Sequence, residues 1–218
     1  SESIAVTNES KRLMQKMAAC RTQATPRISG TEALQIIGSS MFMSKKQHNE
    51  LLSRYLENIP AASIPEGIRL FLAGSPLDNL QLYRIIESLP AVIVAEDNCW
   101  GDRIFEMPID TTLDPFEAIS ERYHTKPPCN RIFPLSRRVE YCVTSAQRAG
   151  SDAAIIFVYE RDSAEAWEVP DKIQAMEGAG IPVLYLKQQP YLIENEDAIR
   201  SQVSEFLNSV NTKNTSAG

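Results

Sequence analysis

The sequence contains few of the residues that most catalytic and metal-binding motifs require. Its 218 residues include two histidines, and its four cysteines are widely spaced with no CxxC pair. The motifs GxSxG, HExxH and GxGxxG and the phosphate-binding P-loop are also absent. These absences argue against a classical catalytic triad, a histidine-based zinc site and a disulfide framework.

Long apolar runs and basic clusters are lacking as well. No stretch approaches the length of a membrane-spanning helix, and the amino terminus has no signal-peptide core. The formal net charge is -6, and no basic run is longer than a pair of residues. We therefore expect a cytoplasmic protein that binds neither nucleic acid nor a membrane.

Helical and strand-like patterns alternate through most of the chain. Helical spacing of apolar residues predicts helices over 11–20, 31–42, 45–58, 79–88, 115–123, 135–149, 169–179 and 196–210. Runs rich in apolar residues predict strands over 68–73, from 91, over 153–159 and over 181–187. The helical segment 1–60 shows no chemical motif.

This order predicts an α/β fold. We expect a four-stranded parallel, doubly wound sheet of flavodoxin or Rossmann type, with strand order 2-1-3-4, preceded by the helical segment. The corresponding division is a helical segment over 1–60, an α/β domain over 61–210 and a disordered tail over 211–218.

The stretch AVIVAEDNCWGDR, residues 91–103, is the strongest candidate for a binding site. Four aliphatic residues are followed closely by Glu96, Asp97, Cys99, Trp100 and Arg103. Ligands of open α/β sheets bind at the carboxyl ends of the strands. Each residue alone is more often a cap, a turn residue or a buried hydrophobe, but the full set exceeds what a turn requires.

Other strand ends carry weaker signals. Gly74 permits a close approach of a ligand to the backbone, and Ser75 or Asp78 is placed to cap the next helix. Cys142 lies on the apolar face of its predicted helix and is expected in the core. The acidic pair Glu96 and Asp97 also suggests a phospho-receiver domain. In that family, however, the acidic pair follows the first strand, whereas here it follows the second.

Six segments, taken in order, resemble a known family. They are PRISGTEAL, IRLFLAGSPLDNLQLYRIIESL, AVIVAEDNCWGDR, DPFEAISERY, PPCNR and WEVPDKIQAMEGAGIPVLYL. The chain from about residue 8 to 210 is similar to the carboxy-terminal half of the 2-hydroxyacyl-CoA dehydratase family. That family includes the 2-hydroxyglutaryl-CoA dehydratase D-component and benzoyl-CoA reductase subunits.

The resemblance implies an enzyme subunit that acts on an acyl-CoA thioester by iron–sulfur-dependent radical electron transfer. It also implies a [4Fe–4S] cluster, a related second subunit and an ATP-dependent activator protein. Family members carry a preceding domain that supplies cluster cysteines, and many have a cysteine where this chain has Asp162 or Ser163. We therefore expect this chain alone to hold no complete cluster and to be inactive. The alternative is a noncatalytic acyl-CoA-binding or subunit-assembly module.

The resemblance also suggests roles for individual residues. Catalytic roles are expected for Glu96, Asp97 and Ser75. Substrate-binding roles are expected for Asp78, Trp100, Arg103, Arg122, Arg131 and Gln189. Arginine forks suit anionic oxygens, so the three arginines are candidates for the CoA phosphates. Cys99 and Cys129 are either cluster ligands or residues that line the site.

Overall fold

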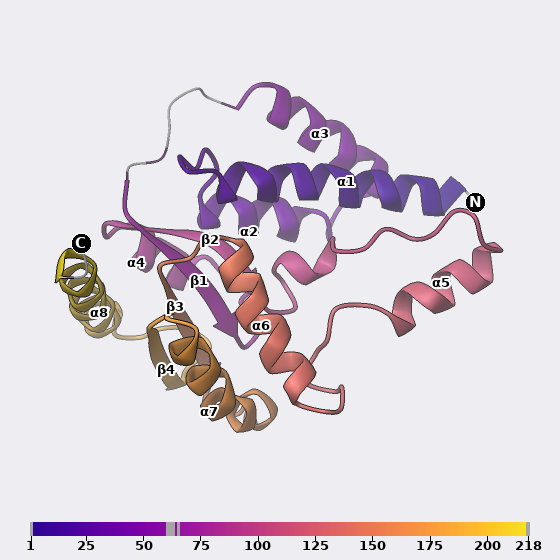
Figure 1. Cartoon of the computed structure of the whole chain (residues 1–218). Coiled ribbons are helices and arrows are strands. Elements are labelled where there is room, and N and C mark those ends of the chain that lie inside the picture. Colours follow the sequence, from indigo (N-terminus) through magenta and orange to yellow (C-terminus); the bar gives the residue numbers. More distant parts are fainter. Residues whose placement is uncertain (1, 60–63, 65, 217–218) are drawn as a thin grey trace.

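A four-stranded parallel sheet forms the centre of the molecule. The computed structural model in Figure 1 describes residues 2–59, 64 and 66–216. The strands are β1 (Ile68–Gly74), β2 (Ala91–Asp97), β3 (Ala153–Tyr159) and β4 (Val183–Gln189). Their order is β2-β1-β3-β4, and every pairing is parallel. The predicted fold class and strand order are therefore confirmed.

Helices cover both faces of this sheet. Leu70 and Leu72 of β1 pack with α4 (Gln81–Glu87) and α8 (Glu196–Ser216), whereas Phe71 and Ala73 pack with α6 (Ser136–Arg148) and α7 (Ser163–Gly178). Successive side chains of a strand point to opposite faces, so an uninterrupted apolar strand needs both layers. Cys142 belongs to the second layer and is fully buried, as predicted.

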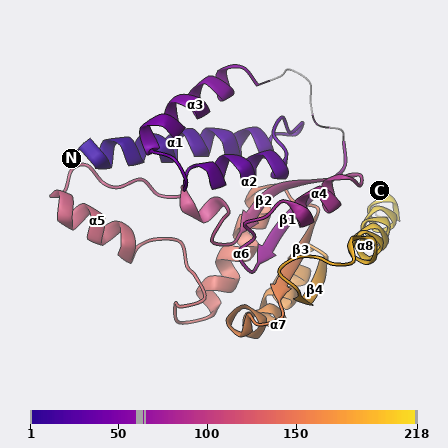
Figure 2. The ribbon, with the colours of Figure 1, turned by 180° about the vertical axis from the view of Figure 1, so that it is seen from behind.

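Three helices precede the sheet and have a core of their own. They are α1 (Glu2–Thr22), α2 (Gly30–Ser39) and α3 (Lys45–Glu57). Met14, Met17, Ile37 and Leu52 are among the residues that hold them together. Ser29 caps α2 in a capping box with Glu32, which explains why this helix begins after the Pro26 turn. Figure 2 shows α1 and α2 beside the β2 edge of the sheet.

Several element boundaries differ from the prediction. Helix α7 begins at Ser163, six residues early, because the Asp162 side chain accepts a hydrogen bond from the backbone N of Glu165. Pro170, near the predicted start at 169, lies inside the helix. Helix α8 continues to Ser216, beyond the predicted tail boundary at 211, and residues 217–218 lie outside the described residues. The predicted boundary at 60–61 also lies outside them.

The glycine that ends β1 has a structural role. Gly74 has φ +117°, and a Cβ atom there would lie 2.1 Å from the backbone oxygen of Phe157 in β3. The close approach predicted at Gly74 therefore exists, but the neighbour is β3. Among the helices within the described ranges, none has the length and apolar character needed to span a bilayer.

Candidate functional site

The carboxyl ends of β1 and β3 are joined by Ser75. Its backbone N donates to the Phe157 oxygen at 2.8 Å, and its Oγ donates to Asp162 at 2.6 Å. The same Oγ accepts from the backbone N of Tyr159 at 3.1 Å. Ser75 is 1% exposed, so its hydroxyl holds two strand ends together. Its catalytic role stays a prediction.

The predicted cap for α4 is wrong. The helix begins after Leu80 without a side-chain cap on that residue, and the side chain of Asn79 accepts a bond from the backbone N of Gln81. Asp78 is exposed and accepts a hydrogen bond from the Tyr191 hydroxyl at 2.9 Å. Asp78 and Tyr191 thus connect the loops that follow β1 and β4.

Glu96 belongs to a buried ionic cluster centred on Arg21 of α1. The Arg21 guanidinium donates to both Glu96 carboxylate oxygens, at 2.6 and 2.9 Å, and to the Ile93 oxygen at 3.0 Å. It also approaches Asp102 at 3.4 Å. Burial, followed by the nearby Glu96 charge, raises the pKa of Asp102 to about 8.

Asp97 forms a second buried pair, with Arg103. Its carboxylate accepts a hydrogen bond from Nε of Arg103, and the side chain is fully buried. Burial, followed by Asp97, raises the pKa of the neighbouring Cys142 thiol well above its usual value. Glu96 and Asp97 thus both contact protein cations, and their catalytic roles stay predictions.

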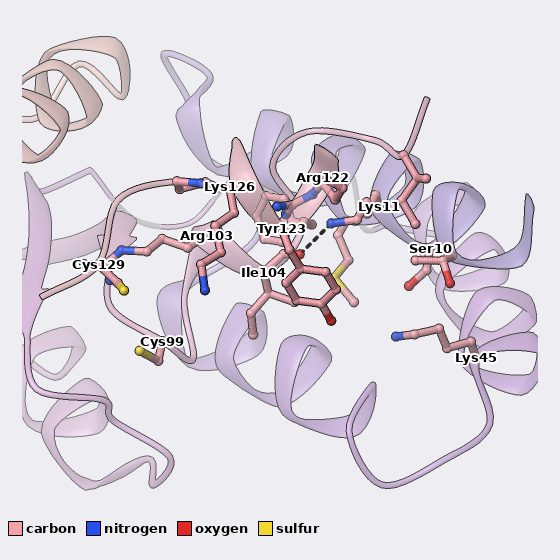
Figure 3. A pocket seen from close by; sticks show the side chains of 15 residues that line it. Ser10, Lys11, Lys45, Cys99, Arg103, Ile104, Arg122, Tyr123, Lys126 and Cys129 are labelled. Carbon is pink, nitrogen blue, oxygen red and sulfur yellow. Dashed lines mark hydrogen bonds between the residues drawn. The ribbon is translucent and has the colours of Figure 1, made fainter. Parts of the chain in front are cut away.

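A cavity of about 400 Å³ lies beside the segment that follows β2, between α1, η1 (Asp102–Ile104) and the region of α5 (Pro115–His124). We call it the cationic cavity, because its lining includes Lys11, Lys45, Arg103, Arg122 and Lys126. Cys99 and Cys129 also line it (Figure 3). Its volume is within the range of small-molecule sites.

Four of the predicted site residues meet in this cavity: Arg103, Arg122, Cys99 and Cys129. Others lie outside its lining. Trp100 packs near Phe42, with ring centroids 6.3 Å apart, and the Gln189 side chain donates to the oxygen of Lys187. Arg131 is exposed on the loop before α6. The structure therefore joins only part of the predicted set in one cavity.

Lys11 is a central cation of the cavity that the sequence reading missed. Its Nζ donates to the backbone oxygens of Ile104 at 2.9 Å and Glu106 at 3.4 Å. Asn8 exchanges two hydrogen bonds with the backbone of Ile109, and Gln15 donates to Phe105. One face of α1 therefore holds the segment after η1. The sequence did contain one signal for this position: Lys11 is three residues before Met14 and therefore lies on the same, buried face of α1.

The charged side chains that line this cavity are all cationic, although one of them, Arg103, is paired with the buried Asp97. Five cationic side chains line it and no Asp or Glu does, although the whole chain carries a net charge of -6. Burial, with added repulsion from Arg122 and Lys45, lowers the pKa of Lys11 to about 8. A site of this kind favours an anion with several negative oxygens, and phosphate groups have that chemistry.

The cavity does not fit a complete iron–sulfur cluster. Cys99 and Cys129 line it, whereas Cys142 is in the sheet core and Cys20 packs among the first three helices. Within the described part of the chain, no group of three or more His, Cys, Asp or Glu side chains is placed to hold a metal ion. A [4Fe–4S] cluster commonly takes four cysteine ligands, so two thiols are an incomplete set.

Comparisons with known proteins identify the family of this chain. The chain is 22% identical over 208 residues to the (R)-phenyllactyl-CoA dehydratase beta subunit of Clostridium sporogenes. The alignment covers 94% of this chain and 55% of that relative, so the chain spans about half the relative's length. Residues 1–210 match the profile of one family. The chain belongs to the family described as 2-hydroxyglutaryl-CoA dehydratase, D-component.

Proposed function

We propose that this chain is the acyl-CoA-binding part of a 2-hydroxyacyl-CoA dehydratase-like subunit, and that the cationic cavity receives the CoA phosphates. The observation that carries the proposal is the cavity lining, in which five cations occur in an acidic protein and, within the described residues, only Arg103 forms an ion pair with a carboxylate, that of Asp97. Both the family and the relative are named after CoA thioesters. CoA has phosphate groups that match these cations.

The cations of the cavity differ in how firmly the protein holds them. Arg103 is oriented by Asp97, and Arg122 donates to the backbone oxygens of Met107 and Glu106 at 2.8 and 2.9 Å. Lys45 is exposed at the start of α3 and has freedom to adapt to a ligand. Oriented guanidiniums together with an exposed lysine suit the phosphate groups of a flexible ligand.

Removing the charge of Lys45 tests the proposal. Lys45→Met is expected to weaken acetyl-CoA binding about twofold to fivefold, because an exposed charge pair contributes up to about 1 kcal/mol. Lys46→Met is the matched control, since Lys46 is the next residue but pairs with Glu2 at 2.6 Å. Isothermal titration calorimetry at low salt measures both. Equal effects of the two substitutions would contradict a phosphate site at Lys45.

Binding is also expected to depend on pH through Lys11. Its pKa of about 8 means that the ammonium charge is present below pH 8 and is lost above it. Acetyl-CoA should therefore bind more weakly at pH 9.5 than at pH 7. A bound phosphate should also raise the pKa of Lys11, so the complex should take up a proton when it forms near pH 8. Calorimetry in two buffers of different ionisation enthalpy measures that uptake.

The matched variant for this pH effect is Lys11→Met. It should bind acetyl-CoA more weakly at pH 7 and lose most of the difference between pH 7 and pH 9.5. Lys46→Met should keep that difference. If the acetyl-CoA affinity of Lys11→Met changed with pH as it does in the unmodified chain, the pH effect would belong to another group.

We further propose that the complete enzyme is an iron–sulfur-dependent dehydratase or a related acyl-CoA reductase, with a second subunit and an ATP-dependent activator. Two cavity cysteines make an incomplete ligand set, so any cluster needs ligands from outside this chain. Anaerobic iron and sulfide analysis of the chain alone, and with its candidate partner subunit, separates this proposal from a noncatalytic module. Iron that appears only with the partner supports the enzyme, and none in either sample supports the module.

A further inference from the structure

The two ends of the cationic cavity differ in chemistry. Figure 3 shows Ser10 and Lys45 toward one end, and Cys99 and Cys129 toward the opposite end. Lys11 and Arg122 lie between them. Cys99 is exposed and Cys129 is half-buried, so the more accessible thiol of this end is Cys99. Arg103 and Lys126 lie toward the thiol end, so cations occur along the whole cavity and thiols at one end only. A ligand with several anionic groups and a sulfur at one end matches this arrangement.

The backbone around Cys99 is well defined. Cys99 follows β2 by two residues, inside a turn in which the backbone N of Gly101 donates to the Asn98 oxygen at 3.2 Å. The Asn98 side chain also accepts from the backbone N of Trp100 at 2.8 Å. These bonds fix the path of the chain on both sides of the thiol.

A buried ionic cluster holds the loop that carries Cys129. Arg138 of α6 donates through Nη1 to the Pro128 oxygen at 3.1 Å. The same guanidinium contacts Glu165 at 3.1 Å and Glu168 at 2.8 Å on α7, and Lys172 pairs with both carboxylates. Both thiols therefore project from anchored backbone.

Arg103 and Lys126 lie at this end of the cavity, and the Arg103 charge is paired with the buried Asp97 carboxylate. Burial lowers the pKa of Arg103, but Asp97 and, to a smaller extent, the Cys99 sulfur raise it above its ordinary value. Figure 3 shows Arg103 and Cys99 toward the same end of the cavity. The thiolate is the form of cysteine that attacks a disulfide.

We propose that CoA lies in the cationic cavity with its phosphates toward Lys45, Lys11 and Arg122 and its sulfur toward Cys99, which makes Cys99 a site of mixed-disulfide formation with CoA disulfide. This inference rests on the proposed CoA binding. The Cys99 thiolate attacks one sulfur of CoA disulfide, the Cys99–CoA disulfide bond forms, and the bond between the two CoA sulfurs breaks. The second CoA leaves as a thiolate and takes up the proton that Cys99 released, so no further oxidant is needed.

The test compares CoA disulfide with glutathione disulfide on the reduced chain. Adducts are followed by intact mass and located by peptide mapping. We expect Cys99 to react with CoA disulfide at least about tenfold faster than with glutathione disulfide, because binding raises the local concentration of the reacting sulfur. Excess adenosine 3′,5′-bisphosphate should remove the advantage. Lys45→Met should slow the reaction with CoA disulfide and leave the glutathione reaction unchanged.

Three results would overturn the inference. They are equal rates with the two disulfides, an adduct on Cys20 before Cys99, and an adduct on Cys129 in place of Cys99. Acetyl-CoA calorimetry on the same sample separates the two proposals. If acetyl-CoA binds but Cys99 is not selectively modified, only the orientation is wrong, whereas absence of acetyl-CoA binding contradicts the proposed function itself.

Discussion

Arg21→Met is expected to lower the free energy of unfolding by about 3–5 kcal/mol, since removing one partner leaves a buried charge without compensation. The Arg21 side chain is fully buried and contacts Glu96, whose side chain is 1% exposed. The substitution also removes the hydrogen bond that Arg21 donates to the Ile93 oxygen. Urea unfolding monitored by circular dichroism measures the change.

The control for this effect is a pair of the same chemistry on the surface. Arg12 and Glu9 contact each other at 2.5 Å, with side chains 50% and 42% exposed. Arg12→Met should therefore change stability by less than about 1 kcal/mol. A loss at Arg21 no larger than the loss at Arg12 would show that the buried cluster contributes little to stability.

Gly74→Ala is expected to be similarly damaging, at about 3–5 kcal/mol, through backbone strain and a steric clash. The residue has φ +117°, and the added Cβ would lie 2.1 Å from the Phe157 oxygen. That oxygen accepts the hydrogen bond from Ser75 N, so the strain falls on the β1–β3 junction. Urea unfolding measures the loss in the free energy of unfolding.

A glycine at the end of α7 provides the comparison. A Cβ on Gly178 would meet nothing within 4 Å, and this residue is the last of its helix. Gly178→Ala should leave stability unchanged or increase it by up to about 1 kcal/mol, because alanine restricts the unfolded chain. Similar losses at both positions would contradict the argument from the Gly74 geometry.

The sheet was predictable because its signals are local. Each strand is rich in apolar residues, and each is separated from the next by helical spacing or turn residues. The start of α7 was harder to predict. Proline is typical of the first turn of a helix, so Pro170 favours a start near residue 169, but in the structure Pro170 lies inside the helix. The capping side chain of Asp162, eight residues earlier, was the better signal.

The candidate site was predictable only where it follows the strands directly. Arg103 and Cys99 come from the stretch after β2, and both line the cavity. Lys11 comes from α1 and reaches the cavity through contacts with Ile104, 93 residues away in the chain. No local pattern encodes such a contact. Nor does sequence show that the Ser75 hydroxyl is already engaged in two hydrogen bonds.

The walls of the cationic cavity come from both sides of the connection between α3 and β1. Lys11 and Lys45 precede that connection, whereas Arg103, Arg122 and Lys126 follow it. A shortened protein that starts at β1 would keep every strand yet present an open, shallow depression with two of its five cations gone. Exchanging the first three helices between relatives should therefore alter ligand preference even when the sheet is left untouched.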